Sequence, residues 1–387
     1  MPPGGGEGDP VGDDGGDGDD GRRGDRSDLR PEGGRGAAHA GARGVRHDPR
    51  HDPRPEDGAI RGVELIGAAI GEGAPDRRTR GGPGSLKRWG LGRRLSARGR
   101  AVHWGPIVAS DLALMPQGPM AVVAEFSVRL ARAVGASLAA GRLPVVIGGD
   151  HSCAVGTWSA AAAALRAGGA GGAGGSDGTA VRGGAVGPLG LVWIDAHLDA
   201  HTPQTSESHM PHGMPIAALL GHGDASLIGV ADVAPKLAPR HLVLIGPRSW
   251  ERGEAALLDR LGVRVMTSAE VERRGFAECM REAIAIATDG TAGWGLSFDL
   301  DALDPEDAPG TGTLVPRGLH VREVAAVLHG LAAGDPRLVA CELVEYNPEL
   351  DRARRTAEAA ECVLGALLDR RDREAAGPCP AVERRGR

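Results

Sequence analysis

Short apolar runs alternate along the chain with longer segments of helical periodicity. Seven runs are rich in apolar and β-branched residues, and they cover residues 63–70, 143–147, 189–194, 241–246, 263–268, 294–298 and 338–344. Several, such as LGLVWI and HLVLIG, are apolar almost throughout, as strands covered on both faces must be. The pattern predicts a single α/β domain with a doubly wound, mostly parallel sheet and helices on both faces.

Helical segments fit between these predicted strands. Phe126, Leu130, Val134 and Leu138 recur every four residues, which predicts a helix with one apolar stripe against the sheet. In a doubly wound sheet, ligands bind beyond the carboxyl ends of the strands. Functional residues are therefore expected just after each strand.

Three segments lack this alternation. Residues 1–58 mix glycine with charges of both signs and carry too few bulky apolar residues to offset the entropy of ordering. A second glycine-rich stretch covers residues 167–187. We predict a disordered tail over 1–58, a catalytic domain over 59–370 with a surface insertion at 167–187, and a polar C-terminal tail over 371–387.

Charge and cysteine content narrow the classes of function. The net charge of -6 gives no basic field of the kind that nucleic acid or an anionic membrane requires. No run approaches 18 apolar residues, and the Met1 end is polar. The five cysteines are odd in number and widely spaced, which fits reduced thiols. We predict a cytoplasmic protein that binds neither nucleic acid nor a membrane.

Polar clusters directly follow four of the predicted strands. They read GGDHS (148–152), DAHLDAHTP (195–203), SFDLDALDP (297–305) and EYNP (345–348). In DAHLDAH, acids and imidazoles are spaced by two, so an extended chain points them the same way. Carboxylates this close repel unless a cation lies between them. A single DxD pair is more often part of a turn, but several such clusters at strand ends predict a metal site. Its oxygen-rich ligands favour Mn²⁺ over Zn²⁺.

These motifs, in this order and over roughly residues 60–368, resemble the ureohydrolase family of arginases and agmatinases, and arginase most of all. The resemblance implies a hydrolase with two Mn²⁺ ions per subunit, in which a bridging hydroxide converts L-arginine to L-ornithine and urea. One ion would be held by His151, Asp195, Asp199 and Asp299, and the other by His197, Asp195, Asp299 and Asp301. The resemblance also implies a homotrimer or homohexamer.

The same resemblance supplies the substrate side of the site. Glu345 matches the family's guanidinium-binding glutamate, and a carboxylate is what a permanently protonated guanidinium needs. His212 matches a histidine that transfers protons, and Asp199 would also bond to the hydroxide. Ser206 and Ser208 match positions that bind the substrate's α-carboxylate. Agmatine lacks that carboxylate, so these serines favour arginine.

Three further residues match the family less closely. Glu251 would help to bind the α-ammonium, and Thr313 would line the pocket, although a surface glutamate and a glycine-rich turn explain them nearly as well. His201 stands where arginases commonly have asparagine, so it would contact the substrate carboxylate or add an extra metal ligand. Trp158 and Trp193 lie in apolar segments and are predicted to be core residues.

Three alternatives stay open. An agmatinase, guanidinobutyrase or formiminoglutamase would use the same metal site on a different substrate. Histone-deacetylase-like amidohydrolases bind one zinc ion and use a tyrosine, but the only tyrosine here, Tyr346, lies beside Glu345. A non-enzymatic scaffold would be expected to lose metal ligands, whereas all six positions are present.

Overall fold

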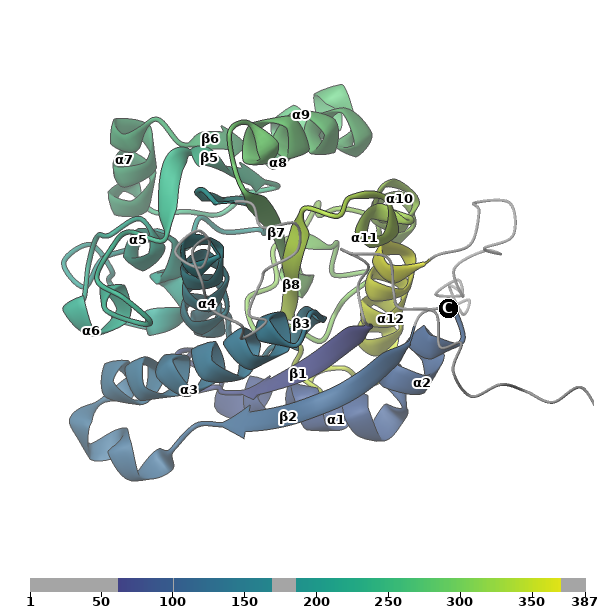
Figure 1. Ribbon diagram of the computed structural model, residues 1–387, viewed down its shortest axis with the longest axis horizontal. Helices are drawn as coiled ribbons and strands as arrows, with labels where there is room; N and C mark the ends of the chain where they lie inside the picture. Colours follow the sequence, from purple (N-terminus) through teal and green to yellow (C-terminus); the bar gives the residue numbers. More distant parts are fainter. Residues whose placement is uncertain (1–61, 100, 169–185, 370–387) are drawn as a thin grey trace, which may run out of the picture. The chain divides into compact units, whose positions relative to one another are not determined.

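The computed structural model describes residues 62–99, 101–168 and 186–369, and Figure 1 gives their arrangement. The predicted tails over 1–58 and 371–387, and nearly all of the insertion at 167–187, lie outside these residues. Within the described ranges, no helix has the length and apolar character needed to cross a membrane.

An eight-stranded sheet lies at the centre of the fold. Its strands follow the order β2-β1-β3-β8-β7-β4-β5-β6, and every neighbouring pair is parallel. The strands are β1 (Val63–Ala69), β2 (Val102–Ala109), β3 (Leu143–Ile147), β4 (Leu189–Ile194), β5 (Leu237–Ile245), β6 (Arg264–Met266), β7 (Gly293–Asp299) and β8 (Leu338–Val344). The predicted parallel α/β sheet is confirmed.

Helices cover both faces of this sheet (Figure 1). Side chains of α1, α2, α9, α10 and α12 belong to one buried cluster, and those of α3, α4, α5 and α7 belong to two clusters that include the opposite faces of the strands. The helices are α1 (Gly82–Trp89), α2 (Leu91–Ser96), α3 (Pro119–Ala139), α4 (Ala154–Ala167), α5 (Pro215–Leu219), α6 (Ala225–Ile228), α7 (Arg252–Leu261), α8 (Ser268–Arg274), α9 (Phe276–Thr288), α10 (Val321–Leu328), α11 (Leu331–Gly334) and α12 (Arg355–Leu368). The fold is therefore doubly wound.

Alternation along the central strands explains why both faces are buried. On β4, Val192 and Ile194 belong to one cluster, whereas Leu191 and Trp193 belong to another. All six β4 residues are buried, which agrees with their near-continuous apolar sequence. The stripe predicted on α3 is buried as well.

Two features differ from the sequence expectation. Strand β2 was not predicted, because it lies at the sheet edge, is mostly half-buried or exposed, and contains Gly105 and Pro106. Cys153 and Cys279 are buried thiols, but Cys362 is disulfide-bonded. The expectation of reduced cysteines is therefore wrong at Cys362, since separation along the sequence does not limit which cysteines meet in space.

Candidate metal centre and substrate pocket

The four polar motifs meet at the carboxyl edge of four adjacent strands. Strands β3, β8, β7 and β4 are consecutive in the sheet, and each is followed by one motif. Ile194 of β4 pairs with Phe298 of β7, so the next residues, Asp195 and Asp299, lie side by side. The parallel register therefore brings together residues more than 100 positions apart in the chain.

One cluster surrounds the buried imidazole of His151. Its Nδ1 atom lies 3.1 Å from Asp195 Oδ2, 3.1 Å from Asp199 Oδ2 and 3.0 Å from Asp299 Oδ2. This Nδ1 atom is buried and has no hydrogen-bond partner, whereas Nε2 contacts the Ser297 hydroxyl. A ring nitrogen directed at three carboxylates is the geometry expected around a cation.

A second cluster adjoins the first and shares Asp195 with it. His197 Nδ1 lies 3.4 Å from Asp195 Oδ1 and 3.3 Å from Asp301 Oδ2. Ligand atoms of His151, Asp195 and Asp299, and likewise of Asp195, His197 and Asp301, lie within 4.8 Å of one another. Asp195 therefore has one oxygen in each group, as a bridging ligand would. The donors present fit two neighbouring cations.

The electrostatics of the clusters favour cations. Burial works against a charge on His197, but the carboxylates of Asp301 and Asp195 outweigh it and raise its pKa to about 12. Burial raises the pKa of Asp299 well above its ordinary value, and Asp301 and Asp195 add to this rise by repulsion. Burial and the nearby Asp195 raise the pKa of Asp199 to about 6. A cation placed between these groups would reduce the repulsion among the carboxylates and balance the negative charge around His197.

Trp193 supports both sides of the first cluster. Its indole Nε1 donates to Asp195 Oδ2 at 2.9 Å, and its ring stacks on His151 with centroids 4.1 Å apart and planes 12° apart. The residue is buried in the core, as expected, but it also fixes one carboxylate and one imidazole.

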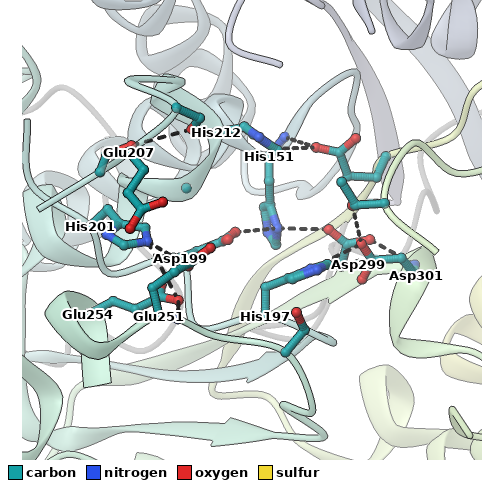
Figure 2. Close-up of a pocket in the computed structure, with 16 residues that line it drawn as sticks. His151, His197, Asp199, His201, Glu207, His212, Glu251, Glu254, Asp299 and Asp301 are labelled. Atoms are coloured by element: carbon teal, nitrogen blue, oxygen red, sulfur yellow. Dashed lines mark hydrogen bonds and ion pairs between the residues drawn. The ribbon is translucent and has the colours of Figure 1, made fainter. Parts of the chain in front are cut away.

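Above the clusters lies a pocket of about 340 Å³, and every lining residue except Gly213 has a polar or charged side chain. Figure 2 shows the side chains of His151, His197, Asp199, Asp299 and Asp301 directed toward one another at one side of it. Every predicted site residue except Asp195 lines this pocket. The lining is His151, His197, Asp199, His201, Ser206, Glu207, Ser208, His212, Gly213, Ser249, Glu251, Glu254, Asp299, Asp301, Thr313 and Glu345.

Glu345 and His212 form one wall of the pocket. Glu345 Oε1 accepts a hydrogen bond from the His151 backbone at 2.8 Å and lies 3.6 Å from His212 Nδ1. Burial opposes a charge on His212, but Glu345 raises the pKa of that imidazole to about 9. The Glu345 backbone N–H donates to the Gly149 carbonyl. A side chain at Gly149 would collide with the Ile70 carbonyl oxygen at 1.7 Å, so this close approach requires glycine.

His201 lies at the opposite wall, together with Glu251 and Glu254 (Figure 2). Its Nε2 is 2.8 Å from Glu251 Oε2, and its Nδ1 is 3.1 Å from Thr205 Oγ1. Within the described ranges it belongs to neither cluster of possible metal ligands around His151 and His197. Both ring nitrogens are therefore engaged with protein groups.

Glu251 and Glu254 begin helix α7 as a capping box, in which each side chain accepts from the other's backbone N–H. Burial raises the pKa of Glu254 to about 8, whereas a hydrogen bond with His201 lowers the pKa of Glu251. The charge at this wall is therefore concentrated on Glu251.

The remaining hydroxyl groups among the predicted residues belong to Ser206 and Ser208, whose oxygens lie 3.4 Å apart, and to Thr313. Ser206 Oγ accepts from the His209 backbone N–H, and Ser208 Oγ accepts from that of Met210. Thr313 donates to Asp301 Oδ2 at 2.9 Å, so its hydroxyl orients a carboxylate of the second cluster.

Four lining residues, Glu207, Gly213, Ser249 and Glu254, were not predicted. Glutamate, glycine and serine are common in surface loops, and no motif marks these positions. The capping-box spacing of Glu251 and Glu254 was the one available signal.

Clustered carboxylates and imidazoles at the carboxyl edge of a doubly wound sheet define a metal-dependent hydrolase. A profile of the arginase family matches residues 61–368. The arginase of Bacillus caldovelox is 35% identical over 320 residues, covering 79% of this chain and 97% of that enzyme. The arginase of Brevibacillus brevis is 39% identical over 246 residues, covering 64% and 75%.

A solved structure agrees with these relatives. The crystal structure of arginase from Bacillus subtilis matches with a TM-score of 0.69 and 32% identity, covering 80% of this chain and 99% of its own. The chain belongs to the arginase family, and the resemblance recognised in its motifs is confirmed.

Proposed function

We propose that this chain hydrolyses L-arginine to L-ornithine and urea. One observation carries the proposal: two His/Asp clusters share Asp195 beside a pocket whose wall holds Glu345. The clusters supply ligands for cations, and Glu345 supplies a carboxylate outside both clusters for a guanidinium. The relatives in Bacillus caldovelox and Brevibacillus brevis, which are named arginases, support the same reaction.

Two manganese ions per subunit belong to the proposal. His151, Asp195, Asp199 and Asp299 would hold one ion, and His197, Asp195, Asp299 and Asp301 the other. Four carboxylates with two imidazoles favour manganese over zinc. When bound, a pair of divalent cations lowers the pKa of a water that they share and so supplies hydroxide near neutral pH.

Glu345 would bind and orient the guanidinium. Its Oε1 is fixed by the His151 backbone N–H at 2.8 Å, and its side chain is almost completely buried. A charge-assisted pair in such a shielded place is strong and directional. The guanidinium carbon would then face the clusters.

His212 and Asp199 would carry protons. Asp199 Oδ2 would accept a proton from the nucleophilic water and pass it to the departing amine of ornithine. His212 Nδ1, 3.6 Å from Glu345 Oε1 and on a partly exposed side chain, would exchange protons with solvent. Its raised pKa keeps this imidazole protonated near neutral pH.

The far end of the pocket favours an amino acid as the substrate. The Ser206 and Ser208 hydroxyls each accept a backbone N–H bond and lie 3.4 Å apart, which leaves at least one hydroxyl hydrogen to donate to an α-carboxylate. Glu251 would bind the α-ammonium. His201 and Thr313 would line the pocket through their contacts with Glu251 and Asp301.

The alternative within the family is another guanidino substrate on the same metal site, as in an agmatinase or a guanidinobutyrase. Urea release in manganese separates the candidates, with L-arginine, agmatine and 4-guanidinobutyrate compared at equal concentrations. We expect L-arginine to give the highest kcat/KM. Faster turnover of agmatine would contradict the assignment of the serines to a carboxylate.

The proposal extends to assembly and location. The family resemblance implies a homotrimer or homohexamer, and the composition of the sequence supports a location in the cytoplasm. Light scattering on the purified full chain measures the mass directly, and a monomer at micromolar concentration would contradict this part.

A further inference from the structure

Behind His151, on the side away from the pocket, lies a row of buried polar groups. His151 Nε2 is 2.9 Å from Ser297 Oγ, and Ser297 Oγ is 2.7 Å from Glu342 Oε1. The same oxygen accepts from Trp158 Nε1 at 2.5 Å. Ser297, Glu342 and Trp158 are at most 1% exposed, and none of them lines the pocket. They cannot contact a substrate, and a buried carboxyl is costly unless it is bonded.

The hydrogen bonds in this row have a definite direction. The indole N–H of Trp158 can only donate, so Glu342 Oε1 is an acceptor. The Ser297 hydroxyl has one hydrogen, and the acceptor at 2.7 Å takes it. Ser297 Oγ can then only accept at its other contact, so the hydrogen between it and His151 belongs to Nε2. Glu342 Oε2 has no partner, and it would carry the proton of the neutral acid, which leaves this order unchanged.

The direction fixes which nitrogen of His151 is available to a cation. A neutral imidazole has one N–H and one lone pair. With the hydrogen on Nε2, the lone pair lies on Nδ1, which is the atom 3.0 to 3.1 Å from Asp299, Asp195 and Asp199. The other tautomer would direct an N–H at this position and block the site.

We propose that Glu342, acting through Ser297, is a positioning residue that holds His151 in the one tautomer able to ligate a divalent cation. The inference rests on the proposed metal site and adds to it Glu342, which no sequence motif marks. Because Glu342 touches neither substrate nor cation, it acts only through the ring of His151.

The surrounding fold holds each member of this row in place. Ser297 of β7 and Glu342 of β8 are paired in the sheet register, so the contact between their side chains follows from strand pairing. A side chain at Gly295 would lie 2.0 Å from Trp158 Cζ3, so glycine there makes room for the indole to reach Glu342. Trp193 stacks on His151 and restrains the plane of its ring.

Manganese binding to the full chain tests the proposal without relying on activity. The metal-depleted protein is dialysed against a series of free Mn²⁺ concentrations, and bound manganese is counted by elemental analysis. Ser297→Ala removes the acceptor for the Nε2 hydrogen, and Glu342→Met removes the acceptor that sets the direction of the Ser297 hydroxyl. For each variant we expect Kd for one of the two ions to rise about 10- to 100-fold. Glu342→Gln keeps an oxygen acceptor and places its amide nitrogen at the unpartnered Oε2 position, so we expect affinity near that of the wild type.

The double variant Ser297→Ala, Glu342→Met separates a relay from general loosening of the core. When two residues act through one row of hydrogen bonds, the effects of their substitutions on manganese affinity do not add. The double variant should therefore bind manganese no more weakly than Ser297→Ala alone. Ser297→Ala removes a single oxygen atom, so this variant still tests the proposal if Glu342→Met does not fold.

Three results would overturn the proposal: wild-type affinity in Ser297→Ala, losses in Glu342→Gln equal to those in Glu342→Met, or additive losses in the double variant. A wild-type chain that binds no manganese would instead refute the proposed function, so the two failures are distinguishable.

Discussion

At the scale of single residues, two carboxylates of the pocket lie on unusual backbone. Asp199 and Glu345 have φ angles of 47° and 64°, which are left-handed values rarely adopted by non-glycine residues. Such a conformation costs on the order of 1 kcal/mol or more and persists where the surroundings fix it. At both positions this backbone directs a carboxylate into the pocket. The placement of these carboxylates therefore lowers the free energy of unfolding.

The first prediction concerns Glu345. Glu345→Gln removes the charge that would pair with the guanidinium, so kcat/KM for L-arginine should fall at least about 100-fold, while the manganese content stays at the wild-type level. Steady-state urea release measures the first quantity and elemental analysis the second. Glu349→Gln, at a mostly exposed carboxylate outside the pocket lining, is the matched control. Equal loss in both variants would refute the role.

The second prediction concerns His212. His212→Asn removes the proposed proton carrier, so kcat should fall about 100-fold with a small change in KM. The wild-type imidazole has a pKa raised to about 9, so it keeps its proton below that pH and loses it above. The kcat profile should therefore decline through pH 9 in the wild type, and this decline should be absent from the variant. His222→Asn, outside the pocket lining, is the control. A decline that persists in His212→Asn would contradict the assignment.

Residue by residue, the sequence identified the groups whose chemistry is concentrated in motifs. His151, Asp195 and Glu345 follow strands within recognisable contexts, and the structure places them together. Glu342 could not be predicted, because it lies inside the apolar run LVACELV and its partner Ser297 is 45 positions away. Contacts of that kind depend on strand pairing, which a single sequence does not reveal.

At the scale of elements, Arg248 ties the segment after β5 to the segment that carries Asp301. Its guanidinium donates to the carbonyl oxygens of Asp301 at 2.7 Å and Val315 at 2.9 Å, and to several others at longer distances. Its backbone N–H donates to the Ala196 carbonyl. One residue thus joins the segments that follow β4, β5 and β7.

The third prediction follows from this arrangement. Lysine keeps the charge but has a single donor nitrogen, so Arg248→Lys should lower the free energy of unfolding by about 2 kcal/mol. Urea denaturation monitored by circular dichroism measures the change, with Arg240→Lys at an exposed position as the control. An unchanged midpoint would mean that the carbonyl contacts contribute nothing measurable.

The fourth prediction concerns the ion pairs between β6, α8 and α9. Hydrogen bonds with Arg264 and Arg274 lower the pKa of Glu270 from 4.5 to about 2. Because the folded pKa is the lower one, the pair stabilises the fold above pH 4.5, and this stabilisation is lost as the pH falls from 4.5 toward 2. Glu270→Gln should cost about 1 kcal/mol at pH 7. The difference in Tm between variant and wild type should shrink at pH 3, and a constant difference would contradict this origin.

Among the elements, the central strands and the edge strand β6 could be predicted, whereas the edge strand β2 could not. β4 and β8 are buried along their whole length, so their apolar runs are unmistakable. β2 lies at the edge with half of its surface exposed, and its glycine and proline resemble a loop. A strand is recognised in the sequence by its run of buried apolar residues and not by its pairing with a neighbour. β2 pairs with β1 but is not buried, so its sequence shows no such run.

At the scale of the whole molecule, the strand order decides the site. The sequence predicted the parallel sheet and the edge at which ligands bind, because both follow from the alternation of strands and helices. It did not give the order β3-β8-β7-β4, which depends on how each crossover packs. This order makes the four motif-bearing strands adjacent, so the convergence of the clusters is a property of the complete fold.

The most direct test of the account combines metal content and activity in one titration. Protein stripped of metal by a chelator is titrated with Mn²⁺, and urea release from L-arginine is measured together with bound manganese. The account predicts no urea from the stripped protein and a rate that rises to saturation as two manganese ions bind per chain. Urea release that reaches its maximum rate with no manganese bound would contradict the account. So would the absence of urea from L-arginine when both ions are bound.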